Sequence, residues 1–292
     1  MRFTDWATRV LIISLMFMAL IVVLLIGRAT KLQHNPTISH TSYPQATAWS
    51  QYPQAQFQSA KYPEKKSQVV IKSPVKTNKA IARYVTTQAF ARYRPNYQVA
   101  SVDPSNYGER YAQDVNGIPV NNQPIIVLHE TGYSASSAVN FFQVAHNDET
   151  VQASYHALIK LDGTVVYLVP PEKRAFGAAN SVFDGSEGVE TVQTNPHLPP
   201  SVNNFAYHVS LETPPDSYDS NSQQTHSGYT EAQYNSLAWL IAQSQVSDDR
   251  ITTHRLVDRS GKKVDPINFD GQKFLNLLNT YRQVRPIYRV SN

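Results

Sequence analysis

An uncharged, apolar run at residues 10–27 does most to limit how the first part of the chain can fold. As an α-helix it would be about 27 Å long at 1.5 Å per residue, close to the thickness of a bilayer's hydrocarbon core. A signal-peptide core is usually shorter, and no small-residue cleavage motif follows the run. We therefore expect a transmembrane signal anchor here, with a cleaved signal peptide as the alternative, and a short cytoplasmic segment at residues 1–9.

Residues 28–77 have the composition of a linker. They are rich in Pro, Gln, Ser, Ala and Tyr, and the tetrapeptide YPQA occurs at residues 43–46 and again at 52–55. Low-complexity sequence with frequent proline favours an extended spacer over a packed core. Plain disorder with no selected length would have the same composition, so no single residue here is given a role.

The charge balance and the lack of cysteine narrow the classes of function. The net charge is +4, which suits attraction to an anionic surface such as cell-wall polymer or lipid headgroups. Much of the excess lies at residues 61–79 and does not form a compact basic patch, so we expect no nucleic-acid partner. Without cysteine the chain has no disulfide, no thiol nucleophile and no thiolate metal ligand.

Strand-like and helix-like segments alternate after residue 123. Residues 124–129 are a nearly all-apolar, β-branched run, which is typical of a strand buried on both faces. Asp162 and Gly163 are a turn signal between two strands of a hairpin. The alternation predicts an α/β domain at residues 123–285, with a central mixed sheet flanked by helices. The other expected strands are 154–160, 164–169, 204–212 and 251–254, and the expected helices are 134–144, 230 onward and 269–281.

Two helix starts are marked by capping residues. Thr230 with Gln233 three positions later forms a capping-box pattern, and Ser134 or Ser136 can cap the helix expected before residue 144. Residues 78–122 are expected to be an N-terminal extension of the domain. Within it, residues 78–92 suggest a helix, and the Pro-, Asn- and Gly-rich remainder suggests a loop.

The histidines are where chemistry could lie. The chain has no H-E-x-x-H helix, P-loop or nucleophile elbow, so any metal site must be assembled from distant segments. His129 ends the buried strand, His254 ends a short strand, and Asp265 follows eleven residues later. Two imidazoles and a carboxylate make a three-ligand zinc set with one open position. An ordinary strand-end histidine and a surface turn explain the same residues, and spacing alone favours that simpler explanation.

Three motifs, in this order, resemble the type 2 N-acetylmuramoyl-L-alanine amidase family, which shares its fold with peptidoglycan recognition proteins and phage T7-type lysozyme. The resemblance covers about residues 123–280. It implies that His129, His254 and Asp265 hold Zn²⁺ and that Lys263 stabilises the tetrahedral intermediate. The motifs are residues 126–131 (IVLHET), 154–159 (SYHALI) with the turn at 162–163, and 253–254 (TH) with 263–266 (KVDP).

The resemblance also leaves the catalytic group open. One branch of the family has a catalytic glutamate where Ser210 stands here, and Glu212, on the same strand parity, could partly substitute for it. Another branch lacks that glutamate and uses a tyrosine just before the histidine of the second strand, a position that Tyr155 occupies. We therefore favour Tyr155 with Lys263 as the catalytic pair and keep Glu212 as the alternative.

Two further positions are compared with the family. Residues 173–176 (KRAF) match a segment that lines the family's cleft and is often followed by a histidine, but here Gly177 follows. A substrate contact could therefore be missing. His156 is expected to be a structural or cleft-lining residue rather than a metal ligand.

The function that the resemblance implies is zinc-dependent hydrolysis of peptidoglycan, at the amide bond between N-acetylmuramic acid and L-alanine. A non-catalytic peptidoglycan-binding module of the same fold is the main alternative, and a membrane-anchored scaffold without a small-molecule site is a further one. Peptidoglycan lies outside the cytoplasmic membrane. We therefore expect a single-pass membrane protein, monomeric, with its catalytic domain on the extracellular, cell-wall side.

Overall fold

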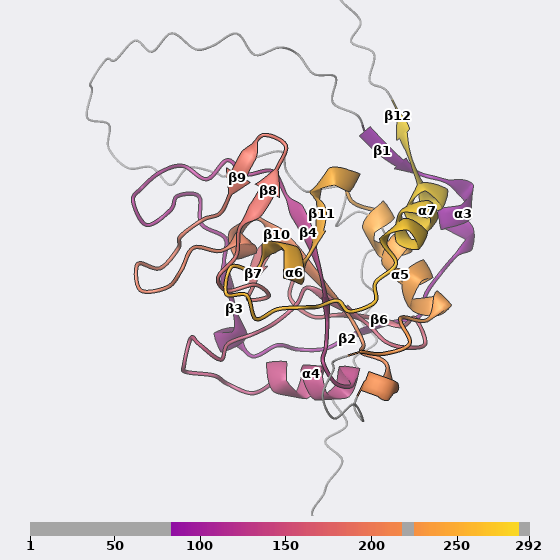
Figure 1. Ribbon diagram of the computed structural model, residues 1–292, viewed down its shortest axis with the longest axis horizontal. Helices are drawn as coiled ribbons and strands as arrows, with labels where there is room; N and C mark the ends of the chain where they lie inside the picture. The colour runs from indigo at the N-terminus through magenta and orange to yellow at the C-terminus, as the bar shows by residue number, and fades with distance from the viewer. Residues whose placement is uncertain (1–82, 218–224, 286–292) are drawn as a thin grey trace, which may run out of the picture. The chain divides into compact units, whose positions relative to one another are not determined.

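The computed structural model describes residues 83–217 and 225–285 of the 292-residue chain (Figure 1). The expected anchor at residues 10–27 and the expected linker at residues 28–77 lie outside these residues. Across the described ranges, no helix has the length and apolar character needed to cross a membrane.

A six-stranded mixed sheet forms the centre of the domain, with the strand order β11-β4-β10-β5-β6-β2. The central pair, β4 (Ile125–Glu130) and β10 (Ala206–Leu211), runs parallel. β11 is parallel to β4 and β5 is parallel to β10, whereas β6 is antiparallel to β5. The predicted α/β architecture with a mixed sheet is confirmed. The outer strands are β11 (Ile251–Thr253), β5 (Ala157–Ile159), β6 (Val165–Tyr167) and β2 (Tyr97–Val99).

Three helices cover one face of the sheet: α3 (Gln88–Arg92), α5 (Glu231–Ala242) and α7 (Gly271–Tyr281) (Figure 1). The capping box that begins α5 is formed as predicted: the Thr230 hydroxyl accepts from Gln233 N–H, and the Gln233 side chain accepts from Thr230 N–H. Burying each large aliphatic side chain contributes about 1.5–3 kcal/mol. The core between the sheet and these helices is built from apolar residues of β4, β10, α5 and α7: Ile126, Leu128, Tyr207, Val209, Leu237, Leu240, Ile241, Phe274 and Leu278.

The opposite face of the sheet carries two further helices. The helices are α4 (Ala135–Phe142) and α6 (His254–Val257), and Ser134 caps α4 by accepting from Ser137 N–H. Because side chains alternate along a strand, this face receives every second residue of β4 and β10. Two small two-stranded antiparallel sheets and four 3₁₀ turns are also present among the described residues. They are β3 (Tyr107–Glu109) with β7 (Lys173–Ala175), β8 (Phe183–Gly185) with β9 (Gly188–Glu190), η1 (Pro104–Asn106), η2 (Val202–Asn204), η3 (Pro215–Ser217) and η4 (Asp248–Arg250).

The helix expected at residues 78–92 is wrong for residues 83–87 and confirmed for residues 88–92. Its first described residues form strand β1 (Arg83–Thr86), which pairs antiparallel with β12 (Arg282–Arg285), and only α3 is helical. Thr87 ends the strand and caps α3 by accepting from Phe90 N–H. A backbone partner from the far end of the chain thus overrides local helical preference. The loop expected after residue 92 also contains two strands, β2 and β3.

Candidate metal and active site

Three candidate ligands meet where β4 and β11 end. His129 lies near the end of β4, and His254 directly follows β11, which pairs with β4 up to Thr253 opposite Leu128. The neighbouring strands therefore bring the two imidazoles together, with ring centroids 4.5 Å apart. Asp265 completes the group, and one ligand atom from each residue lies within 4.8 Å of the others. The structure thus brings together the three residues that the sequence resemblance singled out.

The Asp265 carboxylate lies between the two histidines. Its Oδ1 is 3.1 Å from His254 Nδ1, and its Oδ2 is 3.6 Å from His129 Nδ1. Its backbone carbonyl accepts a hydrogen bond from Arg255 N–H in α6, at 2.9 Å. Glu130 N–H also donates to Oδ2, at 3.4 Å. These bonds join the loop that carries the carboxylate to the two elements that carry the histidines.

The donor set fits a zinc ion. His129 Nδ1 is buried and has no hydrogen-bond partner within the described residues, and a buried polar atom rarely lacks one. Two imidazole nitrogens and one carboxylate oxygen are a common protein contribution to catalytic zinc sites, which leave a fourth position open. His129, His254 and Asp265 therefore fit a zinc ion.

The electrostatics of the cluster favour the protonation states that a metal needs. Burial, followed by the neighbouring His254, lowers the pKa of His129 to about 4. Burial alone would raise the pKa of Asp265, but its attraction to His129 and His254 outweighs burial and holds that pKa below its usual value. At neutral pH His129 is therefore uncharged and Asp265 is ionised, as ligation requires.

Tyr155 lies beside the cluster, two residues before the start of β5. The centroid of its ring is 4.8 Å from that of the His129 ring. The Tyr155 ring also packs edge-on against the ring of Phe142 in α4, with a centroid distance of 5.3 Å. Burial, followed by the negative charge of Asp265, raises the pKa of Tyr155. The hydroxyl therefore remains protonated at neutral pH, where it can donate a hydrogen bond.

Lys263 is exposed on the loop that leads to Asp265. Its backbone N–H donates to Asp258 Oδ2 at 3.2 Å, which fixes the start of that loop. After burial and His254, the positive charge of Lys263 also lowers the pKa of His129. The ammonium group is thus close enough to act electrostatically on the cluster.

Ser210 and Glu212 occupy different surroundings. Ser210 is paired in register with His129 and is buried, and its hydroxyl makes no hydrogen bond among the described residues, although it lies near the Tyr155 hydroxyl. Both carboxylate oxygens of Glu212 accept from backbone N–H groups, of Ala135 at 2.7 Å and Leu161 at 2.9 Å. The carboxylate of Glu212 is therefore engaged with the backbone.

His156 is buried and both of its ring nitrogens face backbone groups. Nδ1 accepts from His208 N–H at 3.0 Å, and Nε2 lies 3.1 Å from the carbonyl oxygen of Lys173. This is the structural role expected for His156.

Sequence reasoning missed His208, whose Nδ1 lies 2.9 Å from His129 Nε2. The signal was present, because strand alternation puts His208 on the same face as Ser210. Gly177 packs against this ring: a Cβ added there would lie 2.5 Å from His208 Cγ. The ring of His208 therefore takes up the space that a side chain at position 177 would need.

Glu130 is a second residue whose role the sequence did not reveal. Its Oε2 accepts from His226 Nε2 at 3.1 Å, from Ile267 N–H at 3.2 Å, and from the Tyr229 hydroxyl. The carboxylate thus binds the segment before α5 and the loop after Asp265 to the end of β4. Only the fold brings these partners together, so no local pattern could have shown them.

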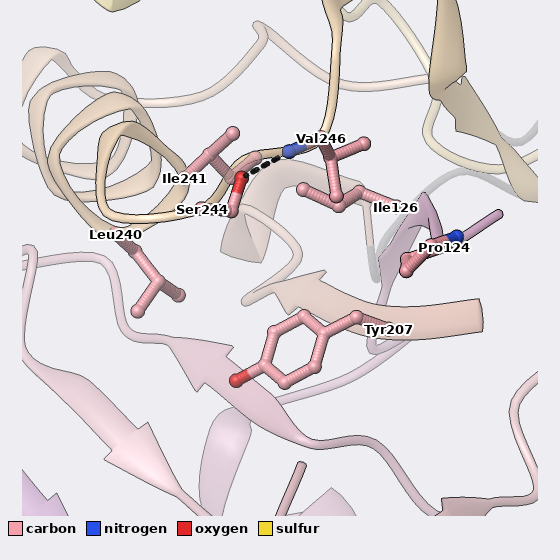
Figure 2. A pocket seen from close by; sticks show the side chains of 7 residues that line it. All are labelled: Pro124, Ile126, Tyr207, Leu240, Ile241, Ser244 and Val246. Atoms are coloured by element: carbon pink, nitrogen blue, oxygen red, sulfur yellow. Dashed lines mark hydrogen bonds between the residues drawn. The ribbon is translucent and has the colours of Figure 1, made fainter. Parts of the chain in front are cut away.

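A small apolar hollow lies elsewhere, between the sheet and α5 (Figure 2). Ile126 and Tyr207 line it from the sheet, and Leu240 lines it from α5. Ile126 points to the opposite face of β4 from His129, so the hollow is separate from the candidate site. Its walls are largely apolar, and the Ser244 hydroxyl among them accepts a hydrogen bond from Val246 N–H.

A sequence model described as N-acetylmuramoyl-L-alanine amidase matches residues 120–268, just over half of the chain. The chain belongs to this family, as its sequence motifs indicated. No sequence among curated proteins matches the chain.

Solved structures of amidases resemble the domain at low sequence identity. A selenomethionine derivative of AmpD is 23% identical, with 61% of this chain and 93% of that chain covered and a TM-score of 0.40. AmpD from Citrobacter freundii is 20% identical, with 63% and 90% covered and a TM-score of 0.37. AmiD from E. coli, in complex with anhydro-N-acetylmuramic acid-L-Ala-D-γ-Glu-L-Lys, is 18% identical, with 53% and 57% covered and a TM-score of 0.42.

Proposed function

We propose that this protein is a zinc-dependent N-acetylmuramoyl-L-alanine amidase that cuts the amide between N-acetylmuramic acid and the first stem-peptide residue of peptidoglycan. The observation that carries the proposal is the convergence of His129, His254 and Asp265 from three separate segments to within 4.8 Å. That convergence occurs in a chain that belongs to the amidase family by sequence. When bound, zinc would supply the Lewis acidity that amide hydrolysis needs at neutral pH.

Two residues beside the cluster would assist the reaction. The pKa of a tyrosine is ordinarily about 10, and burial and Asp265 raise that of Tyr155 further. The protonated hydroxyl would therefore orient the attacking water by hydrogen bonding rather than remove its proton. Lys263 would stabilise the oxyanion that develops on the substrate carbonyl, because charge placed where charge develops lowers the barrier most. Glu212 remains an alternative whose carboxylate already bonds two backbone N–H groups.

The test of this function is the release of stem peptides from purified peptidoglycan, measured as new L-alanine amino termini. The full-length chain is compared with His129→Ala and with His197→Ala, a change of the same kind at an exposed histidine. Loss of release in His129→Ala alone supports the proposal. Equal release by all three would contradict the assignment of the site.

A non-catalytic peptidoglycan-binding module is the second candidate. The observation that favours it is Ser210, which stands in register with His129 without a carboxylate of its own. Such a module would sediment with insoluble peptidoglycan and release no L-alanine termini from it. Release above the level of the His129→Ala variant would exclude a purely binding role.

We also propose that residues 10–27 anchor the chain in the membrane as a single-pass helix, and that residues 28–77 tether a monomeric domain on the cell-wall side. The support is the uncharged apolar run and the proline-rich composition that follows it. Protease added to intact cells or spheroplasts should remove the C-terminal domain. A domain that is protected until the membrane is disrupted would contradict this location.

A further inference from the structure

We propose that His208 is a positioning residue that holds the imidazole of His129 through Nε2 and so directs Nδ1 toward Asp265 and His254. This proposal rests on the proposed function, because His129 is one of the residues that would hold the zinc. The hydrogen bond between the two buried imidazoles can, however, be detected in the metal-free chain.

The two nitrogens of His129 have different surroundings. Nε2 lies 2.9 Å from His208 Nδ1, which is a good hydrogen-bond length between ring nitrogens. Nδ1 lies 3.6 Å from Asp265 Oδ2 and has no hydrogen-bond partner among the described residues. The contact with His208 is therefore the bond that fixes how the ring is turned.

His208 is itself held firmly. It lies on the central strand β10 and is fully buried, and its backbone N–H donates to His156 Nδ1 at 3.0 Å. Its ring stacks on the ring of His156 with an interplanar angle of 11°. On another side Gly177 packs so closely that a Cβ there would lie 2.5 Å from both Cγ and Nδ1 of His208. The ring has little room to rotate away.

The position of one proton follows from this arrangement. A neutral imidazole that offers the Nδ1 lone pair to a metal carries its proton on Nε2. In His129 that proton would be donated to His208 Nδ1, and the proton of His208 would then be on its own Nε2. A ligand imidazole whose second nitrogen is hydrogen-bonded keeps its tautomer and its direction, and loss of such a partner typically lowers metal affinity 10–100-fold.

Three variants of the full-length chain separate the hydrogen bond from packing. His208→Leu removes the acceptor and replaces the ring with an apolar side chain of similar size. His208→Asn keeps a polar oxygen at the position of Nδ1, whereas His208→Gln places one near the position of Nε2. Zinc affinity is measured by competition with a chelator. We expect a loss of about 10–100-fold in the Leu and Gln variants and recovery to within about 3-fold of the wild type in the Asn variant.

A second measurement works on the metal-free chain. With ¹⁵N-labelled histidine, a scalar coupling between His129 Nε2 and His208 Nδ1 reports the hydrogen bond directly, whichever nitrogen carries the proton. Thermal unfolding of the metal-free variants shows whether each one is folded.

The outcomes distinguish this inference from the proposed function. Coupling in the wild type, together with reduced affinity in the Leu and Gln variants that the Asn variant recovers, supports it. No coupling in the wild type, or unchanged zinc affinity in a folded His208→Leu chain, overturns it. If the coupling is present but the wild type binds no zinc, the hydrogen bond stands and the proposed function fails.

Discussion

Glu212 Oε1 accepts a hydrogen bond of 2.7 Å from the backbone N–H of Ala135, the first residue of helix α4. Its other oxygen accepts from Leu161 N–H, at the turn that follows β5. A carboxylate at the first turn of a helix satisfies an otherwise unpaired donor and interacts favourably with the helix dipole. Glu212, just after the end of β10, therefore joins the start of α4 to the hairpin formed by β5 and β6.

Replacing Glu212 with Gln should reduce stability more than it reduces catalysis. The amide provides one acceptor where the carboxylate provides two, so one backbone N–H loses its acceptor at a cost of about 1–3 kcal/mol, and the other bonds a neutral oxygen. Urea unfolding measures this change, with Glu187→Gln at an exposed position as the control. If Glu212→Gln instead abolished turnover with unchanged stability and zinc content, Glu212 would be the catalytic group.

The Tyr155→Phe variant should bind zinc normally and lose turnover roughly 10²-fold, the size expected when a reacting group loses its alignment. The pKa of Tyr155 is raised by burial and by Asp265, so its hydroxyl stays protonated and acts as a donor. The pH–rate profile of the wild type should therefore contain no ionisation from this tyrosine below about pH 10. A rate that rises with pH on an ionisation that is absent from Tyr155→Phe would show that the tyrosine acts as a base.

Lys263→Ala should keep the zinc content of the wild type and lower kcat by roughly 10²- to 10³-fold, because it removes a charge that stabilises the oxyanion. Lys262→Ala, at the neighbouring exposed lysine, is the matched control and should change kcat little. Steady-state kinetics on a soluble muropeptide give both values. Full activity in Lys263→Ala would show that this lysine has no part in the reaction.

The metal-free chain should lose stability as the pH falls from about 6.5 toward 4. His129 has a pKa of about 4 in the fold because of burial and about 6.5 when unfolded. The unfolded state therefore binds the extra proton in this window, and stability rises with pH across it. Buried His156 and His208 act in the same direction. Urea midpoints at pH 7, 6 and 5 in the presence of a chelator measure the slope, which should be smaller in His129→Asn.

A flat stability profile between pH 7 and pH 5 would contradict this prediction. It would mean that His129 is protonated as easily in the folded chain as in the unfolded one.

Local sequence patterns predicted two kinds of element: strands that are buried on both faces, and helices whose first turn is stabilised by neighbouring residues. The apolar run at residues 124–129 identified β4 because a strand covered on both faces needs apolar side chains throughout. Thr230 and Gln233 identified the start of α5 because a capping box is a short-range interaction. β1 was missed because its partner, β12, lies at the other end of the chain.

The same distinction applies to the candidate site. His129, His254 and Asp265 were found through short motifs that resemble a family, whereas spacing alone favoured an ordinary turn. His208 carried a readable signal, its place on the same face of β10 as Ser210, but its hydrogen bond to His129 depends on the register between β10 and β4. Glu130 gave no signal at all, because His226 and Ile267 reach it only through the folded loops.

The decisive experiment measures zinc content and product release together on the purified full-length chain. We expect about one zinc per chain and release of stem peptides with free L-alanine amino termini, which a chelator stops and added zinc restores. Peptide release that continues unchanged after the metal is removed, or a folded chain that binds no zinc, would contradict it.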